Sequence, residues 1–120
     1  MAVILQPCGN KDARAHYNDT VMFPVPHDSV SSFLNETDND NLKDIYPDGM
    51  LKIWGVTPNN QGKWKKVEAG DITLFSKLGS IFASAVATYK IRNKPLAEKL
   101  WGLDAKGNAW EYIYFIAELQ

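Results

Sequence analysis

Short runs of apolar and β-branched residues alternate along the chain with clusters of Gly, Pro and small polar residues. Runs of this length, bounded by turn residues, are typical of β-strands. The runs predict strands at residues 3–5, 50–56, 72–76, 81–89 and 109–116. The tight reversal at Leu78-Gly79-Ser80 predicts that the third and fourth of these strands form a hairpin.

Helical signals are shorter, and they depend on capping residues. Asn10 is placed to cap a helix over residues 10–17, and Asn93 to cap one that ends at Gly102, with Pro95 in its first turn. The pattern also predicts one or two helical turns at 29–34, a short helix at 41–46, and exposed polar loops at 35–41 and 58–62.

The order of these elements indicates the fold class. About five strands are interleaved with short helices, without the regular alternation of a βαβ protein. We therefore predict an α+β fold, with a small mixed sheet or open barrel and flanking short helices. The length of 120 residues is typical of one domain, so residues 1–120 are expected to form a single unit.

The predicted strand at 50–56 places a tryptophan beside a lysine. Because strand side chains alternate, Leu51 and Ile53 share one face, and Lys52 and Trp54 share the other. A lysine is seldom fully buried without a partner, so we expect the face of Trp54 to be partly open to water. The indole there either packs under a loop or binds a ligand.

Two further strands are unusual in their alternation. Ala83, Ala85 and Ala87 share one face of the strand at 81–89 and leave a shallow floor for a closely packed helix or a flat ligand. The strand at 109–116 is apolar on both faces, as expected for a central or barrel-closing strand. One of its faces carries Trp110, Tyr112, Tyr114 and Ile116, and the other carries Ile113 and Phe115 with Glu111.

Composition restricts the protein class. A single cysteine, Cys8, excludes an internal disulfide and a CxxC metal site. The N-terminus lacks the basic and apolar regions of a signal peptide, and no apolar run approaches the roughly 18 residues of a membrane span. We therefore expect a cytoplasmic protein with no membrane partner.

Motifs for catalysis or for cofactors are missing from the sequence. The chain has no G-x-S-x-G, no P-loop and no H-E-x-x-H. Its two histidines, His16 and His27, are not accompanied by a cysteine cluster. We therefore expect a binding domain that is not an enzyme, with no cofactor and no metal site.

Basic residues are interleaved with aromatic ones, a pattern suited to holding phosphates and stacking bases. Two groups stand out: Lys63, Lys65 and Lys66 around Trp64, and Lys90, Arg92 and Lys94 after the long strand. The alternative for each group is a solvated charged face. Since the net charge is −1, any positive surface must be local.

An ordered set of motifs carries a family resemblance over residues 51–118, a little over half of the chain. The motifs are LKIWGVTP, KWKKVEAGDITLFSK, SIFASAVATYK, LAEKLWG and WEYIYFIAE. This block resembles the EVE and YTH branch of the PUA-like superfamily, and most of all the EVE-like domains of prokaryotic modification-dependent restriction proteins of the McrB and HNH types. Residues 1–50 match only in the opening strand and the following Gly9-Asn10.

The resemblance implies a small mixed β-barrel in which an aromatic cage holds a flipped-out modified base. By motif, Trp54 corresponds to the cage tryptophan, and Gly55 to the neighbour whose backbone reads the base edge. Trp101 or Trp110 is the candidate for the second wall, and Asn10 for a polar contact with the base. The two basic groups would then contact the nucleic-acid backbone.

The function implied is a specificity module for modified DNA. Its partners would be nucleic acid and a nuclease or AAA+ motor. Because the sequence ends directly after a strand, we expect a module of a larger protein. Two alternatives stay open: a reader of modified RNA, and a protein-interaction or small-molecule-binding module.

Overall fold

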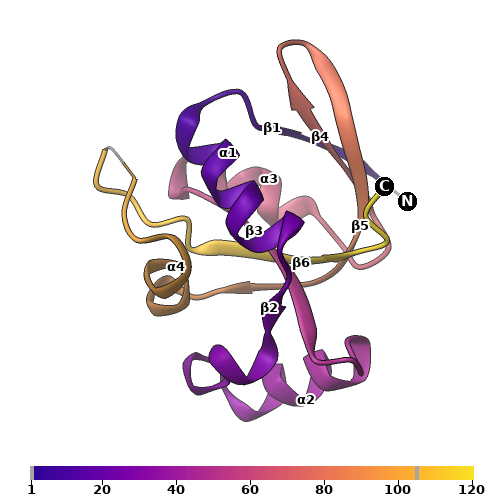
Figure 1. Ribbon diagram of the computed structural model, residues 1–120, viewed down its shortest axis with the longest axis vertical. Helices are drawn as coiled ribbons and strands as arrows, with labels where there is room; N and C mark the ends of the chain where they lie inside the picture. Colours follow the sequence, from indigo (N-terminus) through magenta and orange to yellow (C-terminus); the bar gives the residue numbers. More distant parts are fainter. Residues whose placement is uncertain (1, 105) are drawn as a thin grey trace.

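The computed structural model describes residues 2–104 and 106–120, and its centre is one curved, mixed sheet (Figure 1). The strand order is β1-β4-β5-β6-β3-β2. The strands are β1 (Val3–Pro7), β2 (Val25–Pro26), β3 (Met50–Val56), β4 (Ile72–Lys77), β5 (Ser80–Arg92) and β6 (Tyr112–Ala117). Only β1 and β4 pair in parallel, and the other neighbours are antiparallel. The α+β prediction with a mixed sheet is confirmed, with β2 as an additional short strand.

Helices surround the sheet, and several begin at an asparagine. The α-helices are α1 (Lys11–Tyr17), α2 (Glu36–Ile45), α3 (Gln61–Lys66) and α4 (Lys94–Trp101). Helical turns of other types are η1 (Asn18–Met22), η2 (His27–Ser29), η3 (Ser31–Phe33) and η4 (Pro58–Asn60). Asn10, Asn35 and Asn93 cap α1, α2 and α4 by accepting a hydrogen bond from a backbone N–H in the first turn. The caps predicted at Asn10 and Asn93 are confirmed.

Two predicted loops prove to be helical. The segment 35–41 was expected to be an exposed loop, but α2 begins at Glu36 and continues through the helix predicted at 41–46. Its first-turn acids, Glu36 and Asp38, favour the positive end of a helix, and Leu42 anchors it by burial. The segment 58–62 forms η4 and the start of α3. No helix in the described part of the chain has the length and apolar character to cross a membrane.

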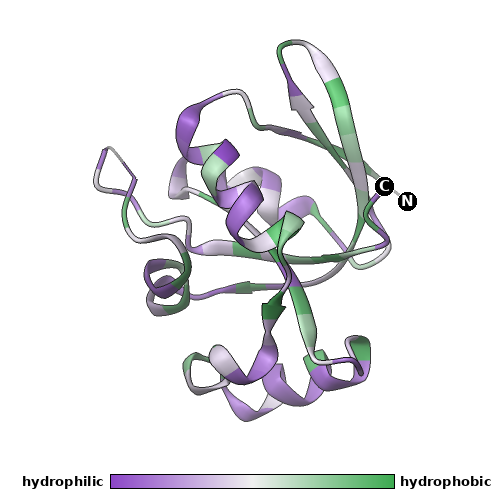
Figure 2. Cartoon of the chain, viewed as in Figure 1, coloured by the Kyte–Doolittle hydropathy of each residue, from purple (hydrophilic) through white to green (hydrophobic). Residues whose placement is uncertain are grey.

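The two faces of the sheet bury two different cores. The aromatic core, which α1, η1 and α3 cover, includes Tyr17, Trp54, Phe75, Trp110, Tyr112 and Tyr114. The aliphatic core, which α2 and α4 cover, includes Leu42, Leu51, Ile53, Leu96, Ile113 and Phe115. The outer surface of α2 is mostly hydrophilic (Figure 2). Trp101 packs against both cores, at the place where they meet.

Strand alternation predicted correctly which residues of β6 share a face. It did not predict correctly how exposed the Trp54 face of β3 is. Tyr112 and Tyr114 lie in the aromatic core, and Ile113 and Phe115 in the aliphatic one, as predicted. The expectation that Trp54 lies on a partly open face is wrong, because only 2% of the residue is exposed. Helix α1 and strand β4 cover the face of the sheet that carries Trp54. These segments are distant in sequence, so the burial could not be inferred from the neighbouring Lys52.

Candidate functional site

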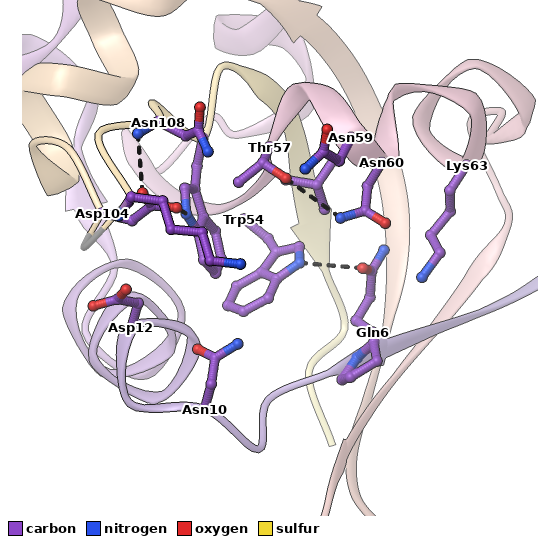
Figure 3. A pocket seen from close by; sticks show the side chains of 14 residues that line it. Gln6, Asn10, Asp12, Trp54, Thr57, Asn59, Asn60, Lys63, Asp104 and Asn108 are labelled. Atoms are coloured by element: carbon purple, nitrogen blue, oxygen red, sulfur yellow. Dashed lines mark hydrogen bonds between the residues drawn. The ribbon is translucent and has the colours of Figure 1, made fainter.

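A cavity of about 530 Å³ opens where the C-terminal end of β1, the start of α1, the β3–α3 connection and the α4–β6 loop converge (Figure 3). These segments are far apart in the sequence, from Gln6 to Trp110. The lining residues are Gln6, Pro7, Asn10, Asp12, Trp54, Val56, Thr57, Asn59, Asn60, Lys63, Asp104, Lys106, Asn108 and Trp110. Three predicted base-contact residues, Trp54, Trp110 and Asn10, are therefore brought together here.

The two indoles lining the cavity form a corner. The ring centroids of Trp54 and Trp110 are 5.5 Å apart and their planes are at 84°, an edge-to-face contact. Trp54 Nε1 donates to Gln6 Oε1 at 3.3 Å, which fixes the orientation of the ring. Because the indoles are perpendicular and only 2% and 8% exposed, they do not form the two parallel walls of a cage.

The loop between α4 and β6 is held in place by a single carboxylate. Asp104 Oδ1 accepts hydrogen bonds from the backbone N–H groups of Lys106 and Asn108, both at 2.9 Å. Asp104 Oδ2 accepts from the indole N–H of Trp110 at 3.4 Å. Hydrogen bonds from the backbone, first that of Asn108, lower the pKa of Asp104 below its usual value. The carboxylate therefore stays ionised and orders this wall of the cavity.

Asn10 caps a helix and also presents its side chain to the cavity. Its Oδ1 accepts a hydrogen bond from the backbone N–H of Ala13 at 2.7 Å and so caps α1. The side chain also lines the cavity (Figure 3), which leaves its Nδ2 group to donate to a ligand. The cap orients this amide before any ligand binds.

Comparison with known proteins adds a fold relationship. No family model matches the chain, and no curated protein does. Among solved structures, the chain is similar to the N-terminal domain of Thermococcus gammatolerans McrB bound to m5C DNA, with a TM-score of 0.68 and 14% identity over 97% of this chain and 72% of that one. The two chains share a fold. At this identity the similarity shows the fold alone, and the narrower EVE/YTH assignment stays a prediction.

Gly55 and Trp101 lie behind the Trp110 wall of this McrB-like fold and do not line the cavity. A Cβ on Gly55 would lie 2.5 Å from the carbonyl oxygen of Trp110 and 2.8 Å from the Trp101 ring, so only glycine permits this packing. Trp101 stacks on the imidazole of His16, with centroids 5.1 Å apart and planes at 21°. Gly55 and Trp101 therefore help to fix the position of Trp110, which lines the cavity.

The predicted backbone-contact cations divide by what they already bind. Lys90 Nζ donates to the carbonyl oxygens of Trp64 and Lys65, at 3.0 and 2.9 Å, and lies 4.7 Å from the centroid of the Trp64 ring. Arg92 forms an ion pair of 2.9 Å with Glu111. These two cations hold the C-terminal end of α3 and the β5–β6 pair in place.

The other predicted cations are oriented differently. Lys63 lines the cavity, although its Nζ also donates to the carbonyl oxygen of Leu5 at 2.9 Å. Lys65, Lys66 and Lys94 have exposed side chains. Four cations are therefore better placed than Lys90 and Arg92 to meet an anionic ligand.

Sequence reasoning missed most of the polar lining. The residues it did not single out are Gln6, Asp12, Thr57, Asn59, Asn60, Asp104 and Asn108. One usable signal was the run of polar residues directly after β3, which was assigned to an exposed loop. The other residues gave no local signal, because their proximity depends on how the α4–β6 loop returns to the sheet.

Neither histidine takes part in a metal cluster. Within residues 2–104 and 106–120 no three His, Cys, Asp or Glu side chains are grouped so that they could hold a metal ion. His16 is buried between Trp101 and Trp110, whereas His27 Nε2 bonds Asn39 Oδ1 at 2.8 Å.

Burial raises the pKa of Cys8 to about 12, so its thiol is protonated and unreactive at neutral pH.

Proposed function

We propose that this domain binds DNA and reads a modified base that is rotated into the cavity at the end of β1. The observation that carries the proposal is the cavity of about 530 Å³ with an indole corner at its floor. It is supported by the shared fold with a McrB domain whose structure was solved bound to m5C DNA. The domain would then be the specificity module of a modification-dependent restriction system.

The energetics of base flipping are compatible with this site. Rotating a base out of a duplex costs a few kcal/mol, and stacking on an aromatic side chain returns about 1–3 kcal/mol. In our proposal the base stacks in the corner of Trp54 and Trp110 and receives a hydrogen bond from Asn10. Gly55 and Trp101 contribute indirectly, because they fix Trp110.

Because the net charge of the chain is −1, phosphates would be bound by a limited group of lysines and not by the surface as a whole. Lys63 and Lys106 line the cavity, and Lys65, Lys66 and Lys94 are exposed. Since each phosphate contact releases counterions, binding should weaken as salt is raised. A nuclease or AAA+ partner and a cytoplasmic location belong to the same proposal.

A blocked cavity tests the proposal better than removal of Trp54. Trp54 packs edge-to-face on Tyr17, Phe75 and Trp110, so Trp54→Ala would remove a core side chain and unfold the domain. Asn60 is exposed and lines the cavity, so Asn60→Trp fills the cavity from its rim. Asn41→Trp, on the exposed surface of α2 and away from the cavity, is the control, and it also removes the hydrogen bond from Asn41 to the Tyr89 hydroxyl.

The measurement is fluorescence anisotropy with duplexes that differ in one modified base. We expect the wild type and Asn41→Trp to bind the modified duplex at least about tenfold more tightly than the unmodified one, and Asn60→Trp to lose this preference. A 2-aminopurine at the target position should become brighter on binding if the base leaves the stack. A wild type without preference, a preference for matched RNA over DNA, or an unaffected Asn60→Trp would contradict the proposal.

A further inference from the structure

The chemistry of the cavity lining points to the kind of modification that is read. Ten of the fourteen lining residues carry an amide, hydroxyl, carboxylate or ammonium group; the other four are Pro7, Trp54, Val56 and Trp110. Polar side chains lie on several sides of Trp54 (Figure 3). Hydrogen-bonding groups therefore line the cavity beside an apolar surface of similar extent that includes Trp54 and Trp110.

A methyl group makes poor use of such a lining. Methyl groups are recognised by close contact with apolar surface, and a missing methylene in an apolar pocket changes binding by only roughly 10–200-fold. Here the lining includes the amide side chains of Asn59, Asn60 and Asn108. A methyl group directed at them would displace water from amides without replacing its hydrogen bonds.

The size of the cavity leads to the same conclusion. Cavities of about 300–1,000 Å³ hold drug-sized ligands, and 530 Å³ lies within that range. A methylated base alone is much smaller, and the perpendicular indoles receive one flat ring only. The volume is therefore compatible with a base that carries a substituent of about the size of a sugar.

We propose that the modified base is a pyrimidine that carries a sugar, with the sugar hydroxyls bound by Asn59, Asn60 and Asn108. This inference rests on the proposed function, because it concerns the same cavity. Each amide offers both donors and an acceptor, which matches a hydroxyl group that donates and accepts. The backbone N–H of Asn108 already donates to Asp104, so the loop that carries its side chain is ordered before binding.

Discrimination by hydroxyl groups can be strong. A site built to bond a hydroxyl rejects an analogue lacking it by as much as about 10⁴–10⁵-fold, because its buried polar groups are left unpaired. Asn59 and Asn60 are exposed at the rim, so a smaller factor is expected here. We expect at least about a tenfold preference for the glycosylated base over the methylated one.

The test uses four duplexes of one sequence with cytosine, 5-methylcytosine, 5-hydroxymethylcytosine or glucosylated 5-hydroxymethylcytosine at one position. The proposal predicts that the glucosylated duplex binds most tightly. If 5-methylcytosine binds as tightly or more tightly, the inference is overturned while the proposed function stands. If all four duplexes bind equally, both are overturned.

Two variants test the assigned amides. The side chain of Asn108 can be removed without loss of its backbone bonds to Asp104, and the Asn60 amide makes only a long bond of 3.4 Å to Thr57. Asn108→Ala and Asn60→Ala should each weaken the glucosylated complex roughly three- to tenfold and leave the 5-methylcytosine complex unchanged. Asn18→Ala, at the exposed end of α1, is the control and should change neither. Unchanged binding of the glucosylated duplex by both cavity variants would overturn the inference.

Discussion

The aromatic and aliphatic cores lie on opposite faces of one sheet, but they differ in how completely their polar groups are satisfied. Among the described residues, the buried side-chain atoms without a hydrogen-bond partner are His16 Nδ1, Thr73 Oγ1 and the Tyr114 hydroxyl. All three lie on the aromatic side. On the aliphatic side, the Tyr46 hydroxyl bonds both Thr88 Oγ1 and the carbonyl oxygen of Ile116, each at 2.7 Å.

The unpartnered polar atoms all lie on the side of the sheet that carries the proposed site. A buried polar group without a partner costs about 1–3 kcal/mol, so three of them are a substantial loss for a domain of this size. Native proteins depart from such rules mainly at functional sites. The unpartnered atoms here belong to the side that contributes Trp54 and Trp110 to the cavity, which supports the proposed function.

The largest expected effect is at the boundary of the two cores. Gly55→Ala would place a methyl group 2.5 Å from the Trp110 carbonyl oxygen, which is backbone and does not yield easily. We expect a loss of about 1–3 kcal/mol or more in the free energy of unfolding, measured by urea denaturation. Gly62→Ala in α3 is the control: a Cβ there meets nothing within 4 Å, and alanine should stabilise the helix slightly. Equal stability of the two variants would contradict the packing described.

Tyrosine-to-phenylalanine substitution should change the free energy of unfolding in opposite directions in the two cores. Tyr114→Phe removes a hydroxyl without a partner and should raise the free energy of unfolding by about 1 kcal/mol, whereas Tyr46→Phe removes two hydrogen bonds and should lower it by about 1–2 kcal/mol. Burial raises the pKa of both tyrosines to about 12, so both are neutral at pH 7. Gln6 lies near enough to the Tyr114 hydroxyl to lower that pKa, but the two side chains do not meet the geometry of a normal hydrogen bond. Destabilisation by both substitutions would remove the contrast between the cores.

A smaller effect is expected at the cavity rim. Lys63→Gln should weaken DNA binding a few-fold and reduce the slope of log K against log salt by about 1, because one phosphate contact is lost. Stability should change little, since the side chain is at the surface. Lys43→Gln on exposed α2 is the control and should leave the slope unchanged. Identical slopes for the two variants would place the phosphates elsewhere.

The smallest effect concerns pH. Burial lowers the pKa of His16 below 6.5, although Asp12, Asp19 and Asp104 act in the opposite direction. Because the folded state binds the proton less readily than the unfolded chain, stability is complete above about pH 6.5 and falls as the pH drops through the lowered pKa. His16→Phe should flatten the decrease in melting temperature between pH 7.5 and 5. An unchanged pH dependence would assign the decrease to other groups.

Local features of this fold were readable from sequence because they are set by neighbouring residues. Asn10 and Asn93 cap helices through bonds three residues away. The hairpin of β4 and β5 follows from its turn, and the two faces of β6 follow from alternation. The start of α2 was missed because its acidic first turn has the composition of a loop, although Asn35 and Glu36 are a favourable helix start.

The candidate site was predictable only in part. Trp54, Trp110 and Asn10 were identified through a family resemblance, and the structure brings all three to one cavity. The aromatic cage stays a prediction, and the angle of 84° between the indoles could not be read from the sequence, because it depends on how the α4–β6 loop is held by Asp104. The polar lining was missed for the same reason.

The sequence by itself determined the helices capped by Asn10 and Asn93, the hairpin, the two-faced last strand and the α+β class, since hydrogen bonds and alternation within a few residues specify each of them. Tertiary structure alone decided that Trp54 is buried and that residues from Gln6 to Trp110 enclose one cavity. Such contacts depend on the packing of segments distant in sequence, which no local pattern records.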